Sequence, residues 1–225
     1  MEEVDGVIAA SRQTGKVAVE AFMYRHHPQT LKVNEIVDGG ALGKLQFIRG
    51  SFTFTIKREG DIRLKKETGG GSIWDVGCYP ISYARMIIGA EPLEVFGWQA
   101  DGPDGIDESF FGQMRFRDDV FAQFDSGFKS PLRTHMELVG TEGTLTIPMP
   151  FKPGRNEKIY LTRGGETEVI PIAGQELYIG EVEDMADAIL LGAEPRVGLQ
   201  DSRNNVAVIQ ALLESARTGK AVALG

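Results

Sequence analysis

Apolar side chains follow two different periods along this chain, and the periods divide it into helical and strand-rich parts. Spacings of three and four residues predict helices at 4–14, 28–38, 72–89, 178–191 and 201–218. Glycines follow these runs as helix C-caps do, and Pro28 stands in a first turn, where a helix accepts proline. Asp201 or Ser202 is expected to cap the last helix.

Alternation of apolar and polar residues predicts strands in most of the remaining chain. The predicted strands are 17–22, 45–56, 95–98, 108–116, 120–128, 133–139, 145–147, 158–161 and 168–172. Short turns such as Asp118–Asp119 and Gly164–Gly165 suit antiparallel hairpins. The order of elements indicates an α+β fold, an open and predominantly antiparallel sheet with helices packed on one face.

A sheet covered on one face leaves its other face to water or to a partner. The predicted strands carry five phenylalanines that cannot all face the helices if side chains alternate: Phe110, Phe116, Phe121, Phe124 and Phe128. Some of them are therefore expected on the open face, where they would favour a dimer or higher homo-oligomer. The alternative is that long loops cover this face.

Composition narrows the class of protein. The 225 residues suffice for one sizeable core, and the net charge of −8 argues against a nucleic-acid or anionic-membrane partner. The acidic N-terminus is unlike a secretory signal, and Cys78, the single cysteine, excludes an internal disulfide and fits a reducing cytoplasm. The spacing of the three histidines and the cysteine predicts no metal site.

The candidate chemistry lies at the glycine-rich stretch 69–81. Three glycines permit a tight turn, and the helix after it carries Asp75 and Tyr79 four residues apart, which predicts a carboxylate and a phenol on one face. Such a pair suits a pocket that handles protons. The alternatives are a carboxylate stabilised at a helix N-terminus and a partly buried tyrosine. Pro80 predicts either a kink or a regular helix that begins near Gly77.

Several stretches together resemble the C-terminal domain of the glucose–fructose oxidoreductase, inositol dehydrogenase and MocA (Gfo/Idh/MocA) family. These stretches are 20–29, 43–45, 69–81, 140–145, 178–193 and 201–219. The resemblance implies the glyceraldehyde-3-phosphate dehydrogenase-like sheet fold, and it implies an NAD- or NADP-dependent oxidoreductase. Its substrate would be a sugar, a polyol or a trans-dihydrodiol.

The resemblance also implies roles for individual residues. Tyr79 matches the position that donates or accepts the substrate proton, and Asp75 matches one that binds substrate hydroxyls or supports the proton-transfer residue. Substrate contacts are expected from Tyr24, Arg25, His27 and Tyr178. For Arg25 an interface salt bridge is the equal alternative.

The first 25 residues look like the remnant helix and crossover strand of a Rossmann domain, and residues 26–225 like the substrate-binding and oligomerisation domain. No G-x-G-x-x-G motif occurs, and the family's Glu-Lys-Pro lysine has no counterpart, since Lys152-Pro153 stands in a late loop. Tight dinucleotide binding by this chain alone is therefore not expected. A non-catalytic module, a truncated gene and a separately expressed domain are the remaining alternatives; the residues specify neither the substrate nor NAD over NADP.

Overall fold

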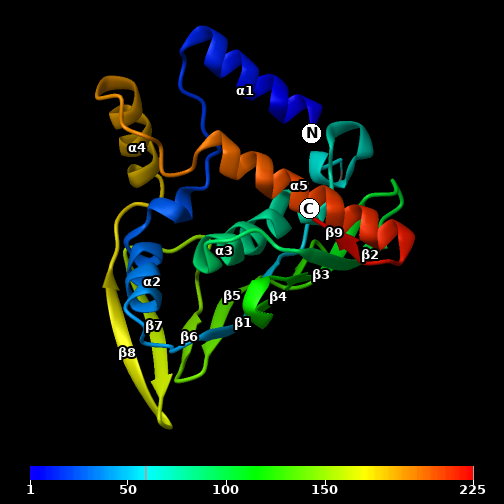
Figure 1. The fold of residues 1–225 in the computed structure, drawn as a ribbon. Helices are drawn as coiled ribbons and strands as arrows, with labels where there is room; N and C mark the ends of the chain where they lie inside the picture. Colours follow the sequence, from blue (N-terminus) through cyan, green and yellow to red (C-terminus); the bar gives the residue numbers. More distant parts are fainter. Residues whose placement is uncertain (59, 225) are drawn as a thin grey trace.

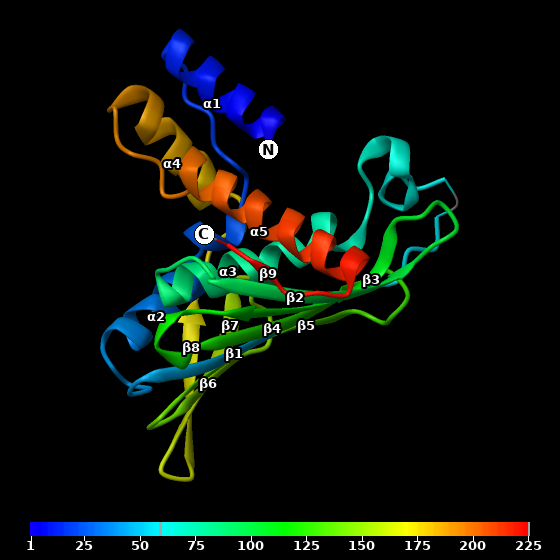
Figure 2. The ribbon, with the colours of Figure 1, turned by 45° about the vertical axis from the view of Figure 1, so that its right-hand side comes forward.

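One sheet with helices on a single face organises residues 1–58 and 60–224, which the computed structural model describes (Figure 1). Within them the strand order is β8-β7-β6-β5-β1-β4-β3-β2-β9. Only β1 and β4 pair in parallel among the described strands, and every other neighbouring pair is antiparallel. Figure 2 shows the helices above the sheet and its lower face uncovered. The predicted α+β fold is confirmed.

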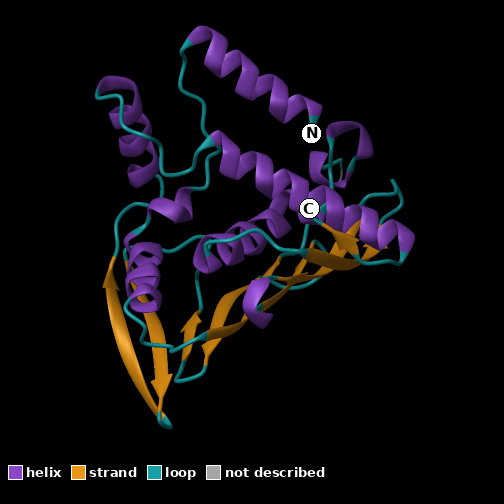
Figure 3. Ribbon diagram, viewed as in Figure 1, coloured by secondary structure: helices purple, strands orange, loops and turns teal. Residues whose placement is uncertain are grey.

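Nearly all elements lie where the periodicity predicted them, and Figure 3 separates the helices from the strands by colour. The strands are β1 Leu45–Thr53, β2 Glu94–Asp101, β3 Asp107–Arg115, β4 Phe121–Gly127, β5 Arg133–Gly140, β6 Thr144–Ile147, β7 Asn156–Arg163, β8 Glu166–Ala173 and β9 Val222–Ala223. The α-helices are α1 Glu2–Thr14, α2 Pro28–Asp38, α3 Cys78–Ile88, α4 Ile179–Leu190 and α5 Leu199–Thr218. Short helical turns are η1 Met23–His26, η2 Ile62–Leu64, η3 Lys66–Thr68, η4 Ile73–Gly77 and η5 Arg117–Asp119. The two-residue β9 was not predicted.

Two predictions at the ends of the chain are wrong. Residues 17–22 form no strand, because no described strand lies beside them to complete their backbone hydrogen bonds. The last helix begins at Leu199 behind Gly198, and not behind Asp201 or Ser202. The carboxylate of Asp201 binds arginines instead of capping the helix.

The covered face of the sheet has a row of glycines under aromatic rings. Gly97 and Gly112 face each other across β2 and β3, and the stacked rings of Phe110 and Phe124 lie against them, with centroids 6.1 Å apart. A side chain at Gly97 would also lie 3.0 Å from the carbonyl oxygen of Leu212 in α5. The missing side chains therefore allow α5 to pack close to the sheet.

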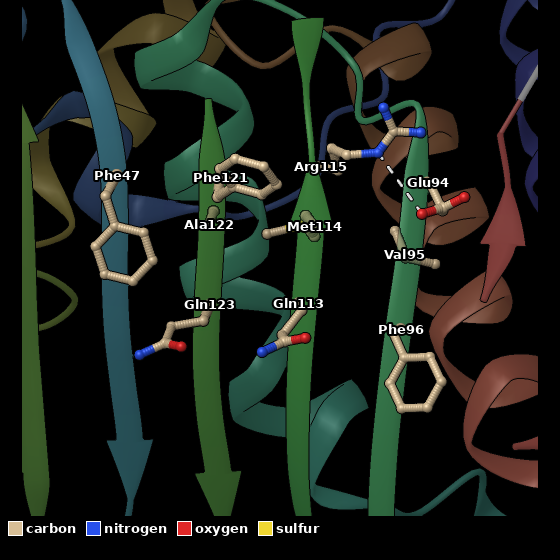
Figure 4. Close-up of a pocket in the computed structure, with 10 residues that line it drawn as sticks. All are labelled: Phe47, Glu94, Val95, Phe96, Gln113, Met114, Arg115, Phe121, Ala122 and Gln123. Carbon is tan, nitrogen blue, oxygen red and sulfur yellow. Dashed lines mark ion pairs between the residues drawn. The ribbon is translucent and has the colours of Figure 1, made fainter. Parts of the chain in front are cut away.

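The open face of the sheet carries exposed aromatic side chains, as predicted, but most of them are not the phenylalanines that were predicted. Among the five predicted phenylalanines only Phe121 is exposed there, because the others lie on the covered face or in the core. Phe111 and Trp98 are more than half exposed, and together with Phe121 they form an exposed aromatic face on β3, β2 and β4. Figure 4 shows Phe47, Phe121 and Phe96 on β1, β4 and β2 around a groove of about 400 Å³.

Candidate active site

A cavity of about 520 Å³ lies where β1, η4 and the loop after β6 meet. It contains both residues of the predicted proton-handling pair. Its lining comprises Met23, Phe52, Phe54, Arg63, Asp75, Val76, Tyr79, Leu132, Thr134, Met149, Lys152 and Tyr178. Aromatic rings beside a few polar groups are a typical lining for a small-molecule site.

The glycine turn positions a loop as well as a helix. The backbone N–H of Gly70 donates to the carbonyl of Lys65 at 2.9 Å, and that of Gly71 donates to Arg63 at 3.0 Å. A side chain at Gly70 would overlap the carbonyl oxygen of Arg63. The loop that contains η2 can therefore lie directly on the turn, and Arg63 reaches the cavity from it.

Arg63 fixes the carboxylate of Asp75. Its Nε lies 3.0 Å from each oxygen of Asp75, and its Nη1 lies 3.3 Å from Oδ1 of Asp61. This orients Asp75 and balances its charge. No pattern in the sequence points to Arg63, since an exposed arginine twelve positions from its partner has no periodic signal.

Tyr79 follows Asp75 across an irregular helical junction. The π-helical turn η4 ends at Gly77 and the regular helix α3 begins at Cys78, which confirms the second alternative drawn from Pro80. Pro80 falls in the first turn of α3, where no backbone donor is needed. Asp75 and Tyr79 both line the cavity, as their spacing predicted.

The phenol of Tyr79 is held in its protonated form. Its ring packs among Phe22, Phe52 and Phe151, with centroid distances of 5.4 to 5.7 Å, and its hydroxyl donates weakly to Sδ of Met23 at 3.9 Å. Burial raises the pKa of Tyr79 well above its ordinary value, and the negative charges nearby raise it further. The phenol is therefore protonated near neutral pH. The raised pKa also makes it a weaker acid, so it can give up its proton only to a strong base such as a developing alkoxide.

Three of the predicted substrate ligands do not line this cavity. Tyr24 is fully buried and stacks on Tyr83 at 5.6 Å. Nη1 of Arg25 lies 3.1 Å from both Ser82 and Asp201, which matches the salt-bridge alternative.

His27 caps α2, since its Nδ1 accepts from the backbone N–H of Gln29, and burial lowers its pKa. Tyr24, Arg25 and His27 lie outside the lining of this cavity, and their role in substrate binding stays a prediction. Only Tyr178 of that group lies in the cavity wall.

Lys152 is an unpredicted member of the wall. Its neighbours Phe151 and Pro153 are buried, so its backbone is well anchored, and its Nζ lies 5.9 Å from the ring centroid of Phe52. It forms no ion pair within the described part of the chain. No pattern in the sequence predicts that this late loop lies beside η4.

The described residues contain neither repeated parallel strand–helix–strand units nor a cluster of side chains placed to hold a metal ion. A dinucleotide site is usually built on parallel strand–helix–strand units, and residues 1–58 and 60–224 contain one parallel pair, β1 and β4. Within the same residues no group of three His, Cys, Asp or Glu side chains is placed to hold a metal ion. Nor is any described helix long and apolar enough to cross a membrane.

Comparison with known proteins gives consistent matches. Residues 30–146 match the family model described as the GFO/IDH/MocA C-terminal domain. The chain is 32% identical to D-xylose 1-dehydrogenase (NADP(+)) 2 of Haloferax volcanii, and the match covers 99% of this chain and 69% of that protein.

Two solved structures have the same fold. The aldose-aldose oxidoreductase from Caulobacter crescentus, complexed with glycerol, superposes with a TM-score of 0.92 at 25% identity and covers 99% of this chain and 68% of its own. A 3-ketoreductase from Actinomadura kijaniata, in complex with NADP and TDP-benzene, gives 0.90 at 26% identity, with 95% and 67% covered. This chain therefore spans about two thirds of the length of these relatives.

Proposed function

Because this chain belongs to the Gfo/Idh/MocA family of oxidoreductases, we propose that it forms the substrate-binding and oligomerisation part of an NAD(P)-dependent oxidoreductase. The substrate would be a sugar, a polyol or a trans-dihydrodiol. One observation carries the proposal: Asp75, Tyr79 and Arg63 meet in the wall of one aromatic cavity. A protonated phenol beside a fixed carboxylate suits a substrate that has a carbonyl group and hydroxyl groups.

The chemistry of each group follows from its surroundings. NAD(P)H supplies a hydride when it is bound. Tyr79, kept neutral by burial, donates its proton to the carbonyl oxygen of the substrate, and the phenolate then recovers a proton from water. Asp75, oriented by Arg63, accepts a hydrogen bond from a substrate hydroxyl. Phe52 and Phe54 offer an apolar surface to the carbon skeleton.

We assign different roles to two parts of the chain. Residues 26–225 would hold the substrate, whereas 1–25 would belong with a nucleotide-binding unit that other parts of the protein supply. NADP is named for two relatives, so it is the first cofactor to test. A single half-buried cysteine fits a cytoplasmic setting.

A homodimer formed through the exposed aromatic face completes the proposal. Phe111, Trp98 and Phe121 present large apolar side chains on neighbouring strands. Contiguous apolar surface of this kind is costly to leave in water, and a second copy of the same face would cover it with two-fold symmetry.

A non-catalytic role is the second candidate function. Only one pair of the described strands is parallel, which supports a module that binds a sugar-like ligand or pairs with full-length relatives. Such a module would retain the cavity and the exposed aromatic face but would not catalyse turnover.

Reconstitution separates the two candidates. The chain is mixed with a separately produced nucleotide-binding domain of the Haloferax relative, and NADPH oxidation is followed with a panel of aldoses, ketoses and diols. Turnover that falls about 100-fold or more in Tyr79→Phe supports the enzyme. Tyr160→Phe, on β7 outside the cavity lining, is the matched control and should keep full activity. Equal activity of Tyr79→Phe and the parent chain would remove Tyr79 from the mechanism.

A further inference from the structure

A buried carboxylate stands behind the segment that carries the candidate site. Asp107, the first residue of β3, is 3% exposed. Its Oδ2 accepts from the Oγ of Ser72 at 2.6 Å and from the backbone N–H of Ile73 at 2.8 Å. Ser72 is also within 3.0 Å of the Oγ of Ser126 in β4. These bonds tie the beginning of η4 to two strands of the sheet.

The glycine turn leaves space for this carboxylate. Gly71 has a φ of 129°, and a side chain there would overlap Oδ1 of Asp107. The same position approaches the indole of Trp74, which would lie 3.7 Å from that side chain. Asp107, Gly71 and Trp74 are thus packed together immediately before Asp75.

No positive charge compensates Asp107 within the described residues, where it forms no ion pair. Three charged groups on the packed elements have other partners: Asp75 of η4 binds Arg63 and Asp125 of β4 binds Arg133. Asp101 of β2, which is opposite Asp107 in the sheet, accepts a hydrogen bond from Nε2 of Gln99 at 2.7 Å. Glu108, the neighbour of Asp107, pairs with Lys129. Hydroxyl and amide dipoles alone stabilise the ionised form of Asp107.

We propose that Asp107 is the positioning residue of the candidate active site, and that its ionised carboxylate holds the η4 segment so that Asp75 and Tyr79 face the cavity. The hydrogen bonds from Ser72 and Ile73 lower the pKa of Asp107, so they are stronger to the ionised carboxylate and weaken when it is protonated while still buried in β3. Burial, the larger effect, raises the pKa of Asp107 to about 6, which brings the change in these two bonds close to physiological pH. The proposal rests on the proposed function only in its identification of the cavity as a catalytic site.

Fluorescence of Trp74 reports whether η4 is attached to Asp107, and it needs neither substrate nor cofactor. The chain has two tryptophans, so Trp98→Phe leaves Trp74 as the only indole. In this parent, emission and acrylamide quenching are recorded from pH 8 to pH 4.5. We expect a transition with a midpoint near pH 6. Asp107→Asn keeps an acceptor for Ile73 but cannot ionise, and it should abolish the transition.

Matched variants make the result decisive. Asp104→Asn, in the exposed loop before β3, should leave the transition unchanged. Asp107→Ala should show, already at pH 7.5, the quenching that the parent shows at pH 5. A transition near pH 6 that survives in Asp107→Asn would overturn the proposal. The absence of any transition in the parent would also overturn the proposal. So would an Asp107→Ala variant that folds and has the same Trp74 emission and quenching at pH 7.5 as the parent.

Sugar binding tests whether the ionisation of Asp107 affects the cavity. Saturation-transfer NMR with D-xylose is run at pH 7 and pH 5, where about one tenth of a group of pKa 6 remains ionised. We expect an affinity loss of up to about tenfold in the parent and none in Asp107→Asn. If the fluorescence transition is present but no sugar binds at either pH, the proposed function fails and the positioning role stands. If the affinity for D-xylose falls equally between pH 7 and pH 5 in the parent and in Asp107→Asn, ionisation of Asp107 does not control the cavity.

Discussion

Nε of Arg63 lies 3.0 Å from both carboxylate oxygens of Asp75, and a glycine turn makes this contact possible. The two residues come from different segments, a surface loop and a π-helical turn, and the backbone of Gly70 and Gly71 joins them.

Replacement of Arg63 by lysine should impair the site without unfolding the protein. Arg63 and Asp75 are partly exposed, so the pair adds at most about 1 kcal/mol to stability. Lysine has a single ammonium nitrogen in place of the Nε that contacts Asp75 and the Nη1 that contacts Asp61, and we expect kcat/KM of the reconstituted enzyme to fall about tenfold or more. Circular dichroism and steady-state kinetics measure the two effects. A melting temperature that drops while kcat/KM stays constant would show that Arg63 is only structural.

Gly70→Ala should destabilise the chain, because the new methyl group would overlap the carbonyl oxygen of Arg63. Such overpacking typically costs about 1–3 kcal/mol. Gly6→Ala is the control: it lies in α1 with open space around it, and alanine should be neutral or stabilising there. Urea denaturation of both variants tests the difference, and equal midpoints would contradict the close approach.

The buried tyrosines should make the fold sensitive to alkali. Burial raises the pKa values of Tyr24, Tyr79 and Tyr83 above those of the unfolded chain. Above about pH 10 the unfolded chain loses these protons and the folded chain keeps them, so stability is complete below pH 10 and falls above it. Urea midpoints at pH 8 and pH 10.5 measure the decline. We expect a smaller decline in Tyr79→Phe, and an identical one would place the effect elsewhere.

Arg85 should be the most costly charged residue to remove. Its side chain is 2% exposed and contacts both oxygens of Glu91 at 2.7 Å, Asp201 at 2.9 Å and Asn205 at 3.2 Å. Arg85→Met would leave the buried oxygen of Asn205 unpaired and would take the partner from the partly exposed carboxylates of Glu91 and Asp201, with an expected loss of about 1–3 kcal/mol. Arg203→Met removes an exposed pair with Asp5 and should cost less than about 1 kcal/mol. Similar losses in both variants would argue against the buried network.

Charge on the exposed aromatic face should keep the protein monomeric. Trp98→Glu with Phe111→Arg places two solvated groups where we propose that a second copy docks. Sedimentation velocity should then show a monomer, with a dimer in the parent and in Ile62→Glu, an exposed loop control. A parent that is monomeric at high concentration would contradict the proposed dimer.

Local patterns predicted the elements well because burial on one side of a strand or helix leaves a regular period. The period also placed Asp75 and Tyr79 together, four residues apart on one segment. It could not find Arg63 or Asp107, whose partners come from other segments. It also could not tell that the turn η1 directs Tyr24 and His27 inward, because a four-residue turn has no period to read.

The parallel pairing of β1 and β4 has a consequence for the order of folding. Ser51 in β1 is hydrogen-bonded to Asp125 in β4, 74 positions later in the chain, and on its other side β1 pairs with β5. The strand that carries Phe52 into the cavity therefore has no partner among the described strands until β4 has been synthesised. Closing such a long loop is slow, so the centre of the sheet should assemble after the local hairpin of β7 and β8. The candidate site would then be among the last parts of the protein to take shape.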